Sequence, residues 1–166
     1  ADKAIDGIVN RDAAKADQSR WATNPSTSQA ARTLTVNLGT QKTFDHFVIE
    51  WERTNITNFK ISVCDTEDGE YRDVYVKNDG ENITSVTSDI QLDEAVTAQY
   101  VKLTVNGYTV NPGSWQSVSL YEFEILGEAE NLSTAATATA DGSETTGTNA
   151  SKAVDGDDTT RWASPA

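Results

Sequence analysis

The chain is poor in the residues that cross-link proteins and that carry much of enzyme chemistry. Its 166 residues include one cysteine, Cys64, one histidine, His46, and no methionine. A single cysteine excludes an intrachain disulfide, so stability must come from a packed core and, we expect, a bound metal. The same scarcity excludes a Cys/His zinc cluster, and a catalytic triad would need His46 beside a serine or Cys64. We therefore predict that the chain is not an enzyme.

Long hydrophobic runs and targeting segments are also lacking. No apolar stretch approaches the roughly 20 residues that a membrane span requires. The chain has no signal peptide and does not start with methionine. We expect it to be a piece of a longer protein whose export signal lies upstream.

Positive charge is scarce as well. Lysine and arginine together number 13, against 26 aspartates and glutamates, so the formal net charge is −13. A field of this sign repels phosphate backbones and anionic lipid head groups. We therefore expect neither nucleic-acid binding nor membrane insertion, whereas the same charge suits the binding of cations.

What the chain has instead is alternation of apolar and polar residues at the two-residue period of a β-strand. The strand candidates are 34–38, 44–51, 59–63, 71–77, 83–90 and 101–105. Turn-forming stretches rich in Gly, Asn and Asp separate them, and no segment has the period of an amphipathic helix. The pattern predicts an all-β fold, an antiparallel sandwich or barrel.

One further strand candidate changes phase partway along. Val118 and Leu120 share one parity, whereas Tyr121, Phe123 and Ile125 share the other. A phase change inside a strand predicts a bulge near residues 120–122, and bulges often lie beside functional sites. Glu122 lies at this position.

The two ends of the chain repeat each other. Lys-Ala-Ile-Asp-Gly at 3–7 recurs as Lys-Ala-Val-Asp-Gly at 152–156, and Ser-Arg-Trp-Ala-Thr at 19–23 recurs as Thr-Arg-Trp-Ala-Ser at 160–164. Such an offset is the length of one domain, and the first copy carries eight extra residues within 8–18. We predict a module at 1–127 that lacks its first strand, followed by a linker and the N-terminal part of a second repeat at 128–166.

A sandwich without its first strand has an unpaired edge. Segment 132–139 is the strand that the first repeat lacks, so we hypothesise that it completes the first sandwich, in the same chain or by a swap between chains. The alternative is a loose tail. Deleting residues 131–166 is expected to lower the melting temperature, measured by thermal unfolding, and an unchanged value would reject the docking.

Seven segments, in order along the first repeat, carry a family resemblance. They are Lys-Ala-Ile-Asp-Gly at 3–7, Ser-Arg-Trp at 19–21, Leu-Thr-Val-Asn-Leu-Gly at 34–39, Phe-Val-Ile-Glu-Trp-Glu at 47–52, Phe-Lys-Ile-Ser-Val at 59–63, Tyr-Val-Lys-Leu at 100–103 and Ser-Leu-Tyr-Glu-Phe-Glu-Ile-Leu-Gly at 119–127. The chain thereby resembles the discoidin, or coagulation-factor C-type, superfamily, and within it carbohydrate-binding module family 32.

The resemblance implies a jelly-roll β-sandwich of about eight antiparallel strands. It implies a lectin-like module appended to a secreted bacterial glycoside hydrolase, with its catalytic domain and further repeats in the same parent chain. The location implied is extracellular or on the bacterial cell surface. Discoidin relatives also bind proteins and surfaces, so an adhesion domain without sugar binding remains the alternative.

The resemblance also implies a structural calcium site. Carried over residue by residue, its ligands are the carbonyls of Lys3, Ile8 and Tyr121, the side chains of Asp6 and Glu122, and the hydroxyl of Ser19. The residues themselves agree, because Asp6 lies in a glycine turn and Glu122 interrupts an apolar strand. Oxygen ligands of this kind suit Ca²⁺. The alternative is two solvated acids, and the second copy has Asp155, Asp157 and Thr160 but no later glutamate.

A sugar site requires an exposed aromatic platform and a few planar polar groups. Relatives build it from loops at one end of the sandwich, which correspond here to 22–29, 52–58 and 107–117. The residues expected to bind sugar are Trp115, Arg53, Asn55, Tyr108, Glu52 and Asn24. The alternatives are that Trp115 covers the core and that Arg53 forms an ion pair with Glu52 or Glu50. Trp21 and Trp51 are expected in the core.

The expected ligand is a host or mucin-type glycan. Galactose-binding relatives often carry a histidine soon after the Arg-Trp pair, and here Ala22, Thr23 and Asn24 follow it. This departure argues against plain terminal galactose and favours glycans that contain N-acetylhexosamine.

Overall fold

The computed structural model describes residues 1–11, 20–23, 30–109 and 117–127. All of these lie in one compact unit, Ala1–Glu128. The predicted second repeat and segment 132–139 lie outside the described residues, so the docking hypothesis stays a prediction.

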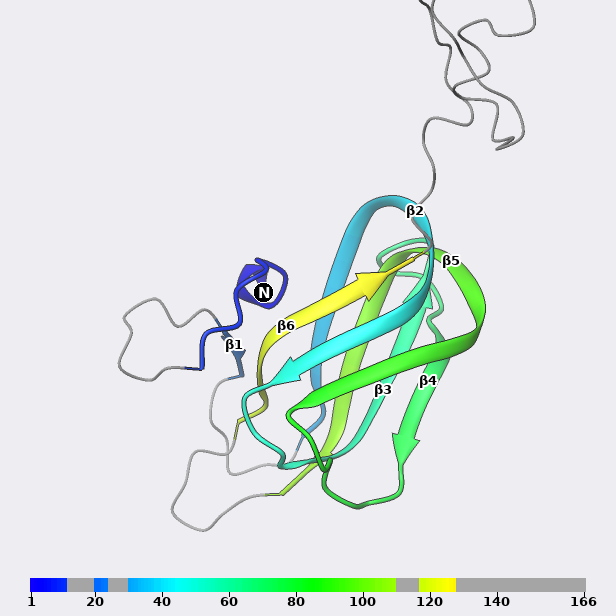
Figure 1. The fold of residues 1–166 in the computed structure, drawn as a ribbon. Coiled ribbons are helices and arrows are strands. Elements are labelled where there is room, and N and C mark those ends of the chain that lie inside the picture. Colours follow the sequence, from blue (N-terminus) through cyan, green and yellow to red (C-terminus); the bar gives the residue numbers. More distant parts are fainter. Residues whose placement is uncertain (12–19, 24–29, 110–116, 128–166) are drawn as a thin grey trace, which may run out of the picture. The chain divides into compact units, whose positions relative to one another are not determined.

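The described chain is almost entirely antiparallel β-structure, as the alternation predicts (Figure 1). Its elements are the 3-10 helix η1 (Asp2–Ala4) and the strands β1 (Trp21–Ala22), β2 (Arg32–Trp51), β3 (Ile56–Cys64), β4 (Arg72–Asn78), β5 (Thr87–Tyr108) and β6 (Ser119–Leu126). The strands are hydrogen-bonded in the order β1-β6-β2-β5-β3-β4. Within the described residues, no helix is long and apolar enough to cross a membrane.

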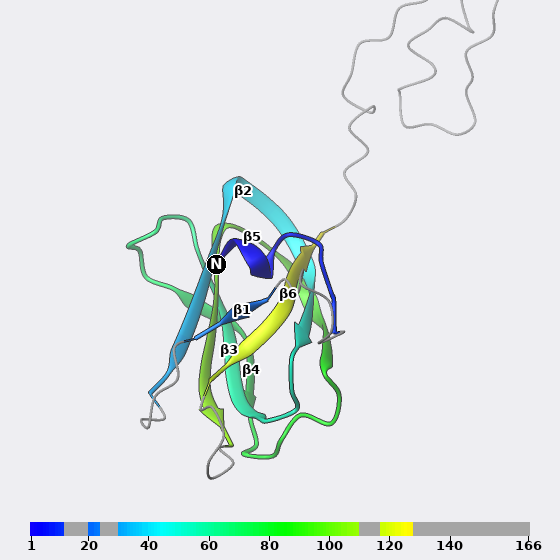
Figure 2. The same cartoon turned by 90° about the vertical axis from the view of Figure 1, so that its left-hand side faces the viewer.

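Two long strands fold this sheet into a sandwich. β2 and β5 arch over together, so that each contributes one half to either layer (Figures 1 and 2). The pairing of β2 with β5 shifts between Asn37 and Lys42 and again between Phe44 and His46. Gly39 supplies a positive φ of 80° at the first shift, a conformation that side chains with a Cβ rarely adopt. With each long strand counted twice, the described residues form eight strand segments, in line with the jelly-roll β-sandwich that the resemblance implies.

The core fills the space between the layers. Leu34 and Val36, Phe59 to Val63, and Val101 to Val105 bury the alternate residues that the sequence pattern predicts. Aromatic rings join the layers: the Trp51 ring lies 5.4 Å from that of Phe59, edge to face. Trp51 is fully buried and Trp21 packs against the core, so both tryptophans lie where they were expected.

The predicted strand at 83–90 is wrong in its first part. β5 begins at Thr87, and Ile83 lies in the preceding loop. Ile83 is nevertheless buried, and its backbone N–H donates to the carbonyl of Ile56 (2.9 Å). Because the apolar residue Ile83 is buried from a loop, its segment has the apolar pattern that is typical of a strand.

The predicted bulge in β6 is confirmed. Glu50 is paired with Glu122 and Trp51 with Leu120, so Tyr121 is the extra residue. As a result Leu120, Tyr121 and Glu122 are all buried, although they are consecutive. The bulge is what places a carboxylate in the interior of the domain.

One hydrogen bond between the neighbouring strands β2 and β5 tests what the buried Trp51 indole contributes to stability. The indole N–H of Trp51 donates to the Ser88 hydroxyl (2.9 Å). Ser88→Ala is expected to lower the free energy of unfolding by about 1–3 kcal/mol, because it leaves a buried donor unsatisfied. Chemical denaturation measures the loss. Ser88→Thr keeps the hydroxyl and is expected to retain most of the stability; an equal loss in both variants would contradict the hydrogen-bond explanation.

Candidate functional site

The structure brings together three of the residues expected to bind sugar. The chain leaves β2 through Glu52, Arg53 and Asn55. These residues line a notch together with Ser117, which precedes β6, and Ser119, its first residue. The notch holds about 10 Å³, room for roughly one water molecule. It is therefore the size of a single ligand hydroxyl.

Arg53 presents an exposed guanidinium at this notch. Glu50 pairs with Arg11 (2.6 Å) and Glu52 with Arg20 (2.8 Å), so neither acid has Arg53 as its partner. Within the described part of the chain, Arg53 has no hydrogen bond or ion pair. The alternative ion-pair interpretation of Arg53 is therefore wrong for these residues, and its donors face solvent.

The other groups of the notch are held in place. The Asn55 side chain donates to the Thr109 carbonyl (3.2 Å), and the Thr109 N–H donates to the Asn55 carbonyl (2.7 Å). Arg20 donates both to Glu52 and to the Ser119 hydroxyl (3.1 Å). These bonds tie the ends of β2, β5 and β6 together around Arg53.

Arg20 is the residue that the sequence-based site prediction missed. It belongs to the Ser-Arg-Trp segment, and its role emerges only when β1 pairs with β6 and brings it to Glu52 and Ser119. The signal was present, because the Arg-Trp pair recurs at 161–162. The repeat does not say which acid the arginine meets.

One predicted sugar-binding residue needs correction. Tyr108 is only 3% exposed and belongs to the hydrophobic core. It is the last residue of β5 and pairs with Ile56, which directs its ring inward. Tyr108 therefore offers no surface to a glycan. Trp115 and Asn24 lie outside the described residues.

A second group of predicted residues surrounds Glu122. The 3-10 helix η1 packs against β6 (Figure 2), and the loop after it turns at Gly7, whose φ is 73°. The Gly7 N–H donates to Glu122 Oε2 (2.9 Å), and the Ile8 N–H donates to Asp6 Oδ1 (3.1 Å). Lys3 and Tyr121 lie on the same two elements, whereas Ser19 lies outside the described residues.

Glu122 is a buried carboxylate with other carboxylates nearby. Its side chain is buried, at 4% exposure. Burial raises the pKa of Glu122, and the nearby carboxylates of Asp6 and Glu124 raise it further, while the N–H groups of Gly7 and Ile8 oppose the shift. Among the described residues, the largest charge contributions to this shift come from carboxylates. A cation between Asp6 and Glu122 would relieve this cost.

The described residues form no metal site of nitrogen and sulfur ligands, either at the Arg53 notch or around Glu122. Among residues 1–11, 20–23, 30–109 and 117–127, no cluster of three or more His, Cys, Asp or Glu side chains forms. Any metal near Glu122 would therefore rely largely on backbone carbonyls, which Ca²⁺ accepts and Zn²⁺ does not favour.

The chain is similar to one known domain family and to several solved structures. The family model for the F5/8 type C domain matches residues 1–122. No curated protein matches the sequence. Among solved structures, chitosan-binding module 1 from a Paenibacillus sp. IK-5 chitosanase/glucanase is 25% identical, with 75% of this chain and 83% of that chain covered and a TM-score of 0.57.

Two further solved structures are similar in fold. Chitosan-binding module 2 from the same Paenibacillus enzyme, in complex with chitotriose, is 24% identical, with 76% of this chain and 85% of that chain covered and a TM-score of 0.58. The family 32 carbohydrate-binding module of Streptococcus pneumoniae EndoD is 18% identical, with 68% and 79% covered and a TM-score of 0.53.

Proposed function

The chain belongs to the F5/8 type C domain family, and from this premise we propose that it is a non-catalytic carbohydrate-binding module. The family match and the neighbouring family 32 modules confirm the resemblance that the seven segments carry. Those neighbours are binding modules, and the chain is homologous to them.

The observation that carries the proposal is the exposed guanidinium of Arg53, which has no partner among the residues that the structure describes. It lies beside the Glu52 carboxylate and the Asn55 amide, at a notch of one-hydroxyl size. A guanidinium donates two parallel hydrogen bonds, which match vicinal hydroxyls of a pyranose, and the carboxylate accepts from a third. We expect Trp115 to supply the apolar platform for the sugar ring.

The ligand proposed is a glycan that contains hexosamine, with N-acetylhexosamine units of host or mucin-type glycans as the first candidates. The missing histidine after Arg20-Trp21 supports this over plain galactose. So does the similarity to modules whose ligands are chitosan and chitotriose, both built from hexosamine units. The net charge of −13 disfavours strongly anionic glycans.

The setting proposed is a secreted or cell-surface bacterial glycoside hydrolase that carries this module and further repeats. A shallow site with one aromatic platform binds weakly, because it buries little ligand surface. Several modules in one chain compensate through multivalency. The sequence repeat at 152–164 supports this arrangement.

A structural calcium ion is proposed beneath the N-terminal loop. Its ligands are the carboxylates of Asp6 and Glu122 and the carbonyls of Lys3, Ile8 and Tyr121, with the Ser19 hydroxyl as a sixth. Support comes from the raised pKa of the buried Glu122 and from the bulge that directs its carboxylate toward the loop. The ion would join the loop to β6 and activate no water.

A glycan array tests the proposed function. Wild-type protein is expected to bind hexosamine-containing glycans, and Arg53→Ala and Trp115→Ala are each expected to reduce the signal strongly. Arg72→Ala, an exposed arginine on β4, serves as the matched control and is expected to bind normally. A flat array for the wild type would reject sugar binding and favour the adhesion alternative.

A further inference from the structure

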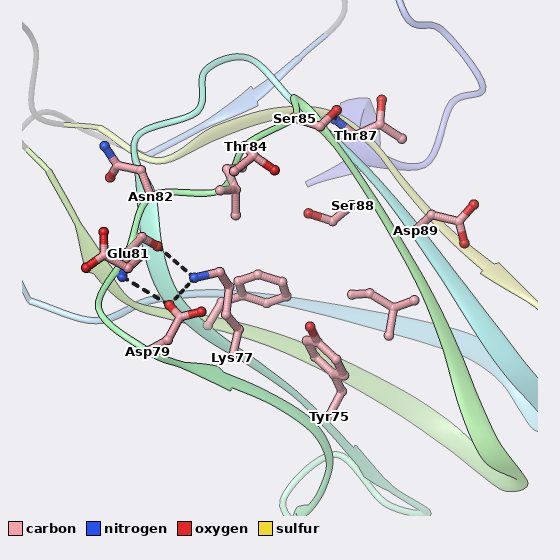
Figure 3. A pocket seen from close by; sticks show the side chains of 13 residues that line it. Tyr75, Lys77, Asp79, Glu81, Asn82, Thr84, Ser85, Thr87, Ser88 and Asp89 are labelled. Carbon is pink, nitrogen blue, oxygen red and sulfur yellow. Dashed lines mark hydrogen bonds and ion pairs between the residues drawn. The ribbon is translucent and has the colours of Figure 1, made fainter.

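A second, larger pocket shares no lining residue with the Arg53 notch. It lies between β4 and the first half of β5, beneath the loop that joins them (Figure 3). Its volume is about 400 Å³, within the range of about 300–1,000 Å³ that small-molecule sites occupy.

The pocket has an apolar floor. Phe59 and Ile90 are core residues at 1% and 5% exposure, and both line it. Tyr75 is half-buried, and its ring lies 5.6 Å from the Phe59 ring. The C–H faces of a pyranose pack on aromatic and aliphatic surfaces of this kind.

Neutral hydroxyl groups converge above this floor. Figure 3 shows the hydroxyls of Tyr75, Thr84 and Ser88 directed toward the middle of the pocket from its different walls. Ser88 accepts a hydrogen bond from Trp51, which leaves its own proton to donate. No described residue hydrogen-bonds to the hydroxyls of Tyr75 or Thr84. Three hydroxyl groups with donor capacity are therefore available to a ligand.

The charged groups of the pocket are already engaged or turned outward. Lys77 forms an ion pair with Asp79 and donates to the carbonyls of Thr57 (2.9 Å) and Glu81 (2.7 Å). Asp89 pairs with His46 (2.7 Å), and its carboxylate points away from the middle of the pocket, as does that of Glu81 (Figure 3). No uncompensated cation lines the described walls, while carboxylates surround the rim. An anionic ligand would meet repulsion there, and a neutral one would not.

From these observations we propose that this pocket is a second carbohydrate site, which binds one neutral pyranose unit independently of the Arg53 notch. An apolar floor with a few convergent neutral hydroxyls matches a sugar with an apolar face and a rim of hydroxyls. The two sites are neighbours through Thr109, which bonds to Asn55 on one side and to the Asn82 side chain on the other (3.3 Å).

NMR titration of the ¹⁵N-labelled chain tests this site. The probes are the methyl glycosides of glucose, galactose, mannose, N-acetylglucosamine and N-acetylgalactosamine, with methyl glucuronide as the anionic comparison. At least one neutral probe is expected to shift the amides of residues 75–90 in a saturable manner. The same shifts are expected in Arg53→Ala, and the glucuronide is expected to bind more weakly.

Two variants separate binding from structure. Tyr75→Phe combined with Thr84→Ala removes two of the hydroxyls and keeps the ring, so affinity at this site is expected to fall on the order of 10-fold. Tyr71→Phe is the matched control and is expected to bind as the wild type does. Saturable shifts at 75–90 that survive the double variant, glucuronide binding as tight as neutral binding, or no shift with any neutral probe would each overturn the proposal. Shifts near 53–55 alone would leave the proposed function standing and reject this site.

Discussion

Calcium is expected to raise the melting temperature of this domain by on the order of 10 °C. Extracellular calcium modules have dissociation constants of about 10⁻⁴–10⁻³ M. About 10 mM calcium, roughly 100 times the lower value, then stabilises the folded state by about 2.7 kcal/mol. In a domain of this size that corresponds to a shift on the order of 10 °C. Calorimetry with calcium and with a chelator measures it.

The effect of Glu122→Gln on folding stability is expected to have opposite signs without and with calcium. Without calcium, the buried charge of Glu122 costs stability, so its amide variant is expected to be more stable than the wild type at neutral pH. The Gln carbonyl still accepts from the Gly7 N–H, which keeps the local structure. With calcium, the variant is expected to lose one of the proposed ligands and most of the stabilisation. Glu124→Gln, exposed on the same strand, is the control and keeps the full calcium response.

The pH dependence of the calcium-free protein follows from the same group. The pKa of Glu122 is raised in the folded state, so the folded state binds the proton more tightly than the unfolded state does. Stability from this group is fully present below the ordinary glutamate pKa and is lost as pH rises through the raised value. Calcium at the proposed site is expected to compete with that proton and to remove the loss. A calcium-free wild type whose pH profile equals that of Glu122→Gln would contradict the account.

Arg53→Ala is expected to weaken glycan binding by about 10- to 100-fold. Hydrogen bonds to a charged group contribute about 1.5–3 kcal/mol, and about 1.4 kcal/mol corresponds to a tenfold change in affinity. Titration calorimetry with a ligand identified on the glycan array measures the change. Arg53→Lys is expected to recover only part of it, because an ammonium cannot make the two parallel bonds of a guanidinium.

The same substitution is expected to leave stability within about 0.5 kcal/mol of the wild type. Arg53 has no partner among the described residues, so its removal breaks no contact of the fold. Arg20→Ala is the contrasting variant, since Arg20 holds Glu52 and Ser119 together. A large loss of stability in Arg53→Ala would show that Arg53 supports the fold rather than the ligand.

The fold class and the bulge were predictable because both follow from the alternation of apolar and polar residues between near neighbours in the sequence. Alternation at Leu34, Val36 and the other strand runs follows from one face of each strand meeting the core. The phase change at Tyr121 has a single geometric explanation, an extra residue in the pairing with β2. The position of Glu122 beside the N-terminal loop came from the family resemblance and not from periodicity.

The arrangement of polar partners was not predictable in the same way. Arg20, Arg53 and Arg11 are all arginines near acids, yet only the pairing of β1, β2 and β6 determines that Glu52 meets Arg20 and that Arg53 meets no described residue. In the sequence, Tyr108 follows the predicted strand 101–105 and has turn residues nearby, as an exposed platform would. Its burial depends on its register with Ile56, a contact between residues 52 positions apart.

The amino-acid sequence by itself determined that this chain forms an antiparallel β-structure of discoidin type, with an arginine at one strand end and a glutamate at a bulge. These features depend on neighbours within a few positions, where the two-residue period of a strand decides which side chains turn inward. Only the tertiary structure decided which charges are compensated and where a pocket opens. The arching of β2 and β5 separates β4 from the first half of β5, and the space between them depends on packing across the whole chain.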